Sequence, residues 1–187
     1  MAENFNTYID NIEVGFWREL CISEGELMFF DKGAEFVKAG NVGRYIGYIK
    51  SGTMKYVVHS DDGTEHVIGL EFSGEFVTDF PFSLYRLPSR ASIIAVSPCH
   101  VYCVPVTKVA SLMEADQRVK DIVMHSTEAV YSTVYDRYVD MHTKTSHRRY
   151  NELVNRHPDL FSLFSLRDIA SFLNITPTHL SRLRKNS

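Results

Sequence analysis

The sequence has no long apolar run, few cysteines and no excess of basic charge. Its 187 residues include no apolar stretch near the ~18 residues that a membrane helix needs. Residues 1–10 lack the basic and then apolar pattern of a signal peptide. Three cysteines without a CxxC spacing provide neither a disulfide framework nor the thiolates of an iron–sulfur sensor. These absences predict a cytoplasmic protein that makes no contact with a membrane.

Motifs of enzymes and metal sites are also missing. There is no phosphate-binding glycine loop, no HExxH and no GxSxG. None of the eight histidines stands in a recognisable ligand spacing. We therefore predict no enzymatic activity, no metal and no cofactor. Cys99 and Cys103 would share one face of a strand, as two reduced buried thiols or, alternatively, as a redox switch.

The charge of the chain is unevenly distributed. The whole sequence has 20 Lys+Arg and 23 Asp+Glu, and this net charge of −3 by itself argues against a nucleic-acid partner. Residues 1–143, however, hold 12 basic and 20 acidic side chains (−8), and residues 144–187 hold 8 basic and 3 acidic (+5). A basic end on an acidic body is typical of a DNA-binding module joined to another domain, although an ordinary solvated helical surface gives the same balance.

Glycine marks the first part of the chain as β-structure. All ten glycines lie at or before Gly74, and Gly52, Gly63 and Gly74 are eleven residues apart. Short apolar or β-branched runs separate these turn signals, which is typical of a small sandwich or jelly roll. We expect the β domain to end near residue 106 and to follow an N-terminal helix over residues 5–20. The predicted strands cover residues 45–49, 54–59, 66–72, 91–96 and 100–104.

From residue 107 the hydrophobic period changes from two to about 3.6, which indicates a helix. A helix over residues 116–142 would be ~40 Å long. Two copies of the chain could pair along its apolar stripe as a homodimer. The alternative is that the stripe packs wholly against the chain's own β domain. The stripe consists of Val119, Val123, Val130, Val134, Tyr138 and Met141.

The remaining residues predict a helix-turn-helix. Ser165 and Asp168 form a capping-box pattern, Asn174 tolerates the left-handed conformation at a helix end, and Thr176 with Pro177 opens a second helix. Such a second helix can enter the DNA major groove, where Arg182 would contact guanine through two hydrogen bonds. The predicted DNA contacts are Arg167, Thr176, Pro177, Thr178, His179, Ser181, Arg182 and Lys185.

Six short motifs resemble the Crp/Fnr family of transcription regulators. They are residues 30–33 (FDKG), 47–52 (GYIKSG), 62–65 (DGTE), 73–76 (SGEF), 168–177 (DIASFLNITP) and 180–185 (LSRLRK). The last motif is similar to a subgroup common in Bacteroidetes. The resemblance implies an α+β chain with a cyclic-nucleotide-binding-like β-roll (1–115), a dimerisation helix (116–143) and a helix-turn-helix (144–187) that lacks the β-hairpin wing of many family members.

The resemblance also implies a small effector inside the β-roll. The positions that bind ribose and phosphate in cyclic-nucleotide members match Asp79 and Arg90. Thr78 replaces a usual glycine, Asp79 a usual Glu, and Ala91 a usual Ser or Thr. These departures argue against a cyclic nucleotide and leave an apolar or amphipathic effector, or none, as alternatives. The candidate effector-binding residues are Glu75, Thr78, Asp79, Arg90, Ala91 and Ser92.

These features together predict an effector-gated transcription regulator that binds double-stranded DNA sequence-specifically as a homodimer, with RNA polymerase as a further partner. The alternative is a small-molecule-binding or protein-interaction module that has lost DNA binding. The missing wing and the short side chains of Pro177 and Thr178, at the start of the recognition helix, favour the alternative.

Overall fold

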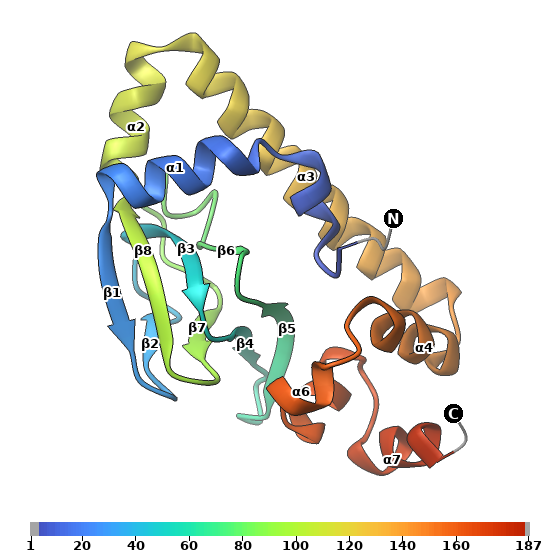
Figure 1. The fold of residues 1–187 in the computed structure, drawn as a ribbon. Helices are drawn as coiled ribbons and strands as arrows, with labels where there is room; N and C mark the ends of the chain where they lie inside the picture. Colours follow the sequence, from blue (N-terminus) through green and yellow to red (C-terminus); the bar gives the residue numbers. More distant parts are fainter. Residues whose placement is uncertain (1–3, 186–187) are drawn as a thin grey trace.

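The computed structural model describes residues 4–185 as a β-roll with helices on either side of it in the sequence (Figure 1). Two antiparallel four-stranded sheets have the strand orders β1-β8-β3-β6 and β2-β7-β4-β5. Their buried faces share side chains such as Ile49, Met54 and Ile93. The predicted α+β fold class is therefore confirmed. The strands are β1 (Glu26–Phe30), β2 (Glu35–Val37), β3 (Tyr45–Ser51), β4 (Met54–His59), β5 (Glu65–Glu71), β6 (Phe76–Val77), β7 (Ser92–Ala95) and β8 (Cys99–Pro105).

The evenly spaced glycines form turns, as predicted. Gly52, Gly63 and Gly74 have φ angles of 95°, 81° and 91°, a region that glycine enters without a steric penalty. In the β4–β5 hairpin the amide of Gly63 donates to the carbonyl of Ser60 over 2.8 Å. The five predicted strands correspond to β3, β4, β5, β7 and β8.

Three strands were not predicted, and all three lie at sheet edges. β1 and β6 bound one sheet, and β2 bounds the other. β2 and β6 are only 3 and 2 residues long. A strand this short has too few residues to establish an alternating pattern, so its pairing with a neighbouring strand defines it.

The helix expected over residues 5–20 is wrong in its extent. The structure instead has a 3-10 helix, η1 (Thr7–Asn11), and a separate helix α1 (Val14–Glu24), with Ile12 extended between them. Asn6 lies before η1 and donates to the carbonyl of Leu70 over 2.9 Å, while Tyr8 donates to Glu71 over 3.0 Å. Hydrogen bonds to β5, which is distant in the sequence, therefore determine the conformation of this segment. The helical pattern of its own residues does not.

Helix α2 (Val106–Ala115) leads into α3 (Gln117–Thr143), which confirms the helix predicted over residues 116–142. The predicted stripe on α3 divides into two parts. Val119 and Val123 are buried in a core formed with α1, α2 and β8. The other members are exposed, together with two further tyrosines of the same helix: Val130, Tyr131, Val134, Tyr135, Tyr138 and Met141.

The C-terminal helices pack on the β-roll. They are α4 (Ser146–Arg156), α5 (Leu160–Leu163), α6 (Leu166–Phe172) and α7 (Pro177–Lys185). Leu160, Ile169 and Leu180 share one buried cluster with Val57 and Leu70 of the roll. Figure 1 shows α6 beside the edge strand β5, with α7 farther from the sheets. The roll therefore supports the helix pair through α6 and leaves the outer side of α7 uncovered.

Candidate nucleic-acid interface and effector site

The ends of α6 and α7 have the caps that the sequence predicts. The amide of Asp168 donates to Oγ of Ser165 over 3.1 Å, and that hydroxyl lies 2.6 Å from Oδ2 of Asp168. Asn174 has a φ of 53° in the turn between the helices. Oγ1 of Thr176 then accepts from the amide of His179 over 3.2 Å. These local bonds fix the two helices relative to each other.

The outer face of α7 is exposed and polar. Its members are Thr176, Pro177, Thr178, Ser181, Arg182 and Lys185. Arg182 makes no hydrogen bond or ion pair with any residue in 4–185, so its guanidinium is available to a partner. His179 is half-buried, with its ring 3.4 Å from Oγ of Ser146. Arg167 of α6 is exposed near the start of its own helix.

Other basic side chains of the C-terminal region are already engaged. Lys144 lies 2.8 Å from Asp140 and 2.7 Å from Glu152, and Arg148 lies 3.0 Å from Glu152. Arg184 stacks over the ring of Phe161 at 4.4 Å. Within the part of the chain that the structure describes, the basic side chains of this region that have no hydrogen bond or ion pair are therefore Arg167, Arg182 and Lys185.

Arg149 hydrogen-bonds to the ends of two helices. Its guanidinium donates to the carbonyls of Lys144 (2.7 Å) and Leu173 (3.1 Å), which are at the C-terminal ends of α3 and α6. A cation at these ends is stabilised by the helix dipole. Arg149 thus links the long helix to the helix pair.

Among the candidate effector residues, Glu75 is buried, and its carboxyl group is hydrogen-bonded to other groups of the chain. Its Oε2 accepts from the amide of Phe72 (2.9 Å) and from Nδ2 of Asn6 (2.7 Å). Thr78 exchanges two backbone bonds with the hydroxyl of Tyr56, which donates to its carbonyl (2.9 Å) and accepts from its amide (3.1 Å). The Tyr56 side chain therefore occupies space next to this segment.

The segment from Thr78 to Ser83 holds three buried oxygens without a hydrogen-bond partner. They are Oγ1 of Thr78, Oδ2 of Asp79 and Oγ of Ser83. Burial raises the pKa of Asp79, and a hydrogen bond with Ser89 opposes that increase. A Cβ on Gly43 would lie 3.3 Å from the Cβ atoms of both Asp79 and Ser83, so the surroundings are tight. Unpaired buried oxygens are uncommon and favour a small polar ligand or ordered water here.

The remaining candidates differ in their exposure and in their partners. Arg90 is exposed and Ala91 is buried. Oγ of Ser92 accepts from the amide of Ala39 over 2.9 Å and donates to Glu35 over 3.3 Å, and it therefore faces the β2 side. Thr78 and Asp79 therefore hold two of the unpaired oxygens, whereas Glu75 and Ser92 are hydrogen-bonded to other groups of the chain.

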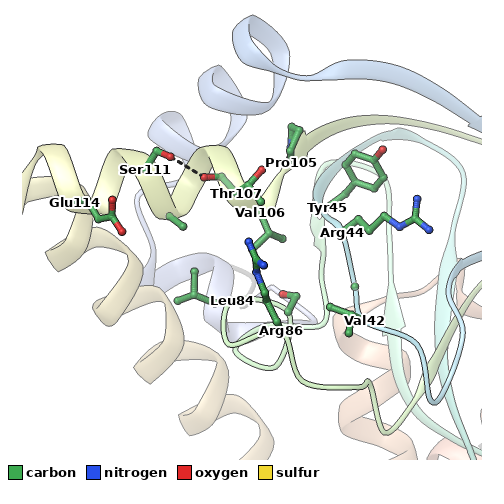
Figure 2. A pocket seen from close by; sticks show the side chains of 13 residues that line it. Val42, Arg44, Tyr45, Leu84, Arg86, Pro105, Val106, Thr107, Ser111 and Glu114 are labelled. Carbon is green, nitrogen blue, oxygen red and sulfur yellow. Dashed lines mark hydrogen bonds between the residues drawn. The ribbon is translucent and has the colours of Figure 1, made fainter.

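A cleft of about 610 Å³ lies between the β6–β7 loop and α2. Figure 2 shows Arg86 extending from this loop toward the start of α2, with Ser111 and Glu114 farther along that helix. Arg44, Tyr45 and the buried Ser83 also line the cleft. Sequence reasoning missed Arg44 and Arg86, because they come from separate loops and match no motif.

The contact between α6 and the β-roll was also missed. Lys55 of β4 lies 2.7 Å from both Asp168 of α6 and Glu65 of β5. The amide of Val67 donates to Oγ of Ser171 over 2.9 Å. Burial alone would lower the pKa of Lys55, but its bonds to Asp168 and Glu65 raise it. Burial would likewise raise the pKa of Asp168, but its bonds with Lys55 and Ser165 lower it.

Removing the Asp168 carboxylate should destabilise the protein more than removing that of Glu65. Asp168→Ala takes away both the helix cap and the buried partner of Lys55, and we expect a loss of about 1–3 kcal/mol in unfolding free energy. Glu65→Ala removes a more exposed partner and should lose less than about 1 kcal/mol. Urea denaturation of the two variants measures the difference, and equal losses would contradict this role for the α6 contact.

The cysteines show no sign of a ligand site. Cys21, Cys99 and Cys103 are unpaired and buried. Burial raises the pKa of Cys21 and Cys103 to about 12, so both thiols stay protonated. No group of three or more potential metal ligands occurs within residues 4–185. In the same range, no helix is long and apolar enough to cross a bilayer.

Known proteins resemble this chain in one domain and in the whole fold. Residues 27–116 match the family model of the cyclic nucleotide-binding domain. FixK2 from Bradyrhizobium japonicum has a TM-score of 0.75 at 17% identity, over 87% of this chain and 83% of its own. CLP, a c-di-GMP-responsive global regulator from Xanthomonas campestris, has 0.68 at 14%, over 93% and 91%.

A protein from Eubacterium rectale, described as a transcriptional regulator of the Crp/Fnr family, has a TM-score of 0.72 at 14% identity, over 90% of this chain and 81% of its own. No curated protein matches the sequence. At these identities the likeness establishes the fold: a cyclic-nucleotide-binding β-roll, a long helix and C-terminal helices arranged as in Crp/Fnr regulators.

Proposed function

We propose that this protein is a transcription regulator of the Crp/Fnr type that binds double-stranded DNA sequence-specifically as a homodimer. The observation that carries the proposal is the capped pair α6–α7, whose outer face presents Arg182 and Lys185 without a hydrogen-bond or ion-pair partner among residues 4–185. In a helix-turn-helix, the N-terminal part and outer face of the second helix contact base edges. The 180–185 motif further favours the Bacteroidetes-like subgroup.

Each exposed side chain of α7 has a role that follows from its chemistry. The planar guanidinium of Arg182 fits O6 and N7 of guanine. Arg167, Thr178 and Ser181 are suited to phosphate oxygens, and Lys185 supplies a mobile positive charge. Pro177 is short and rigid, so a base methyl group is its expected neighbour. Two such helices, about 34 Å apart in a dimer, would read two half-sites.

The dimer would form along the exposed half of α3. Tyr131 and Tyr135 stack on each other at 5.9 Å between ring centroids, yet both remain exposed in the single chain. Val134 and Met141 are exposed on the same helix. A second copy covering this face would bury a row of aromatic and aliphatic side chains, which are enriched at protein interfaces.

The proposed effector site is the segment from Thr78 to Ser83 and the adjoining cleft. Three buried oxygens without partners favour an effector with hydrogen-bond donors. The cleft is lined by both apolar and polar side chains, which suits an amphipathic molecule. The departures from the family pattern at Thr78, Asp79 and Ala91 argue against a nucleotide held as in cyclic-nucleotide members. RNA polymerase remains a further proposed partner.

A binding module that has lost DNA recognition is the second candidate. The short, exposed Pro177 and Thr178 favour it, because they provide no long polar side chain at the start of α7. Gel-shift assays on fragments of the source genome separate the two functions. Retarded fragments that share a sequence support DNA recognition, whereas the absence of any retarded fragment supports the second candidate.

Salt provides a direct check of the phosphate contacts. A dimer with at least three such contacts per helix pair should lose about 10³-fold in affinity between about 50 mM and about 200 mM salt. Fluorescence anisotropy with a retarded fragment measures this slope. Binding that is insensitive to salt would show that the basic residues of α7 do not contact the backbone.

A further inference from the structure

A cluster of buried polar groups lies where the β-roll, the long helix and the helix pair meet. Glu71 ends β5 and Glu75 follows four residues after it, and both carboxyl groups are buried. Nδ2 of Asn6 donates to Oε2 of Glu71 (3.0 Å) and to Oε2 of Glu75 (2.7 Å). One amide group thus joins two acidic side chains that are almost completely buried.

Both carboxyl groups accept from one amide nitrogen, so they lie close together in a buried site. Two buried carboxylates at such close quarters repel each other, and one proton on the pair relieves this repulsion. Neither carboxyl group takes part in any ion pair formed by residues 4–185. The guanidinium of Arg137 is the cation of the cluster, and it donates to Oδ1 of Asn6. With one shared proton, Glu71, Glu75 and Arg137 together have no net charge.

Arg137 connects this cluster to the helix pair. Its guanidinium lies over the ring of Phe5 at 5.2 Å and over the ring of Phe172 at 5.3 Å. Phe172 is the last residue of α6, and Phe5 also packs on Phe72, between the two glutamates. The contacts among Phe5, Arg137 and Phe172 therefore join the buried carboxyl groups to the end of α6.

We propose that Glu71 and Glu75 together hold one proton while α6 is docked on the β-roll, and that release of this proton to solvent undocks the helix pair. Loss of the proton leaves two negative charges and one positive charge in a buried site, which is stable only when hydrated. The inference rests on the proposed function for its effect on DNA binding. The link between this proton and the docking of α6 does not depend on DNA binding.

Other titratable groups face the cluster from each neighbouring element. Burial and then the charge of the partner carboxyl group raise the pKa of Glu71, and burial raises that of Glu75. His157 stacks on Phe72 at 3.9 Å, and burial lowers its pKa, so it stays neutral above the acidic range. The remaining groups are Tyr8 of η1, Tyr56 of β4, Asp79 of the β6–β7 loop, Arg137 of α3 and Arg156 of α4.

The directions of these pKa shifts determine how the stability of docking changes with pH. A carboxyl group whose pKa is higher in the docked state stabilises docking at low pH, and this stabilisation disappears as the pH rises through the docked pKa. The pKa of Asp168 is lowered and that of Lys55 is raised, so their ion pair stays charged throughout the neutral range. Docking should therefore weaken as the pH rises.

Hydrogen exchange at the amide of Val67 measures docking, because this amide donates to Ser171 of α6. In the wild-type chain we expect the opening equilibrium, corrected for intrinsic exchange, to increase by up to about tenfold per pH unit as the pH rises from the usual carboxyl pKa to the raised pKa of the docked pair. Glu71→Gln keeps a donor to Glu75 and holds no titratable proton, so its opening should be independent of pH. Glu75→Gln should behave alike, and it serves if Glu71→Gln does not fold.

Glu19→Gln is the matched control, because Glu19 is exposed on α1. It should keep the wild-type slope. A wild-type slope of zero, or an unchanged slope in both cluster variants, overturns the proposal. A slope at Val67 without DNA binding at any pH supports the proton-linked docking and overturns the proposed function instead.

Discussion

Arg182→Ala is expected to abolish the sequence preference of DNA binding while leaving the dimer intact. A bidentate contact to guanine contributes about 1–3 kcal/mol of discrimination, so each half-site should lose about tenfold or more in preference. Non-specific binding should change far less, because other basic groups of the helix pair remain. Competition binding between a retarded fragment and a scrambled fragment measures the ratio.

Two controls make this result specific. Arg182→Lys keeps the charge but not the planar pair of donors, so it should lose preference nearly as far as Arg182→Ala. Arg18→Ala removes an exposed charge from α1, remote in sequence from α7, and should change nothing. Selectivity that survives in Arg182→Ala would show that another residue reads the operator.

Tyr135→Glu is expected to convert the dimer into a monomer. Tyr135 lies in the middle of the exposed half of α3, with 52% of its surface accessible, so the single chain tolerates a charge there. In the proposed dimer the same charge would be buried without a partner, which is strongly unfavourable. Loss of the second half-site should then reduce operator affinity about 10²–10⁴-fold.

Analytical ultracentrifugation measures the loss of the dimer, and gel-shift titration measures the loss of operator affinity. Tyr85→Glu is the matched control, because Tyr85 is also an exposed tyrosine (68%) and lies in the β6–β7 loop, away from α3 in the sequence. It should leave both the mass and the affinity unchanged. A Tyr135→Glu variant that stays dimeric would place the interface elsewhere on the molecule.

The parts of the fold that local chemistry determines could be read from the sequence. Gly52, Gly63 and Gly74 mark turns because their positive φ angles demand glycine. The caps of α6 and α7 involve bonds over three residues, from Ser165 to Asp168 and from Thr176 to His179. Such short-range bonds leave a pattern in the sequence.

Long-range contacts leave no such pattern, and they account for what the sequence did not predict. Asn6 bonds to a residue 69 positions away, and Lys55 pairs with one 113 positions away. The first contact explains why the N-terminal helix is broken and why Glu75, predicted to bind an effector, is engaged within the chain. The second shows why the docking of α6 could not be foreseen: its partners carry no motif of their own.

The position of α6 on β5 has a consequence for solubility. β5 is the outer strand of its sheet, and the amide of Val67 points away from β4 toward Ser171. An uncovered edge of this kind offers unpaired amide and carbonyl groups to strands of other molecules. Ile68 is already 52% exposed on the same strand. When the helix pair undocks, the protein would therefore expose the edge of β5 to strands of other molecules. Docked α6 thus also protects the protein from aggregation through this sheet.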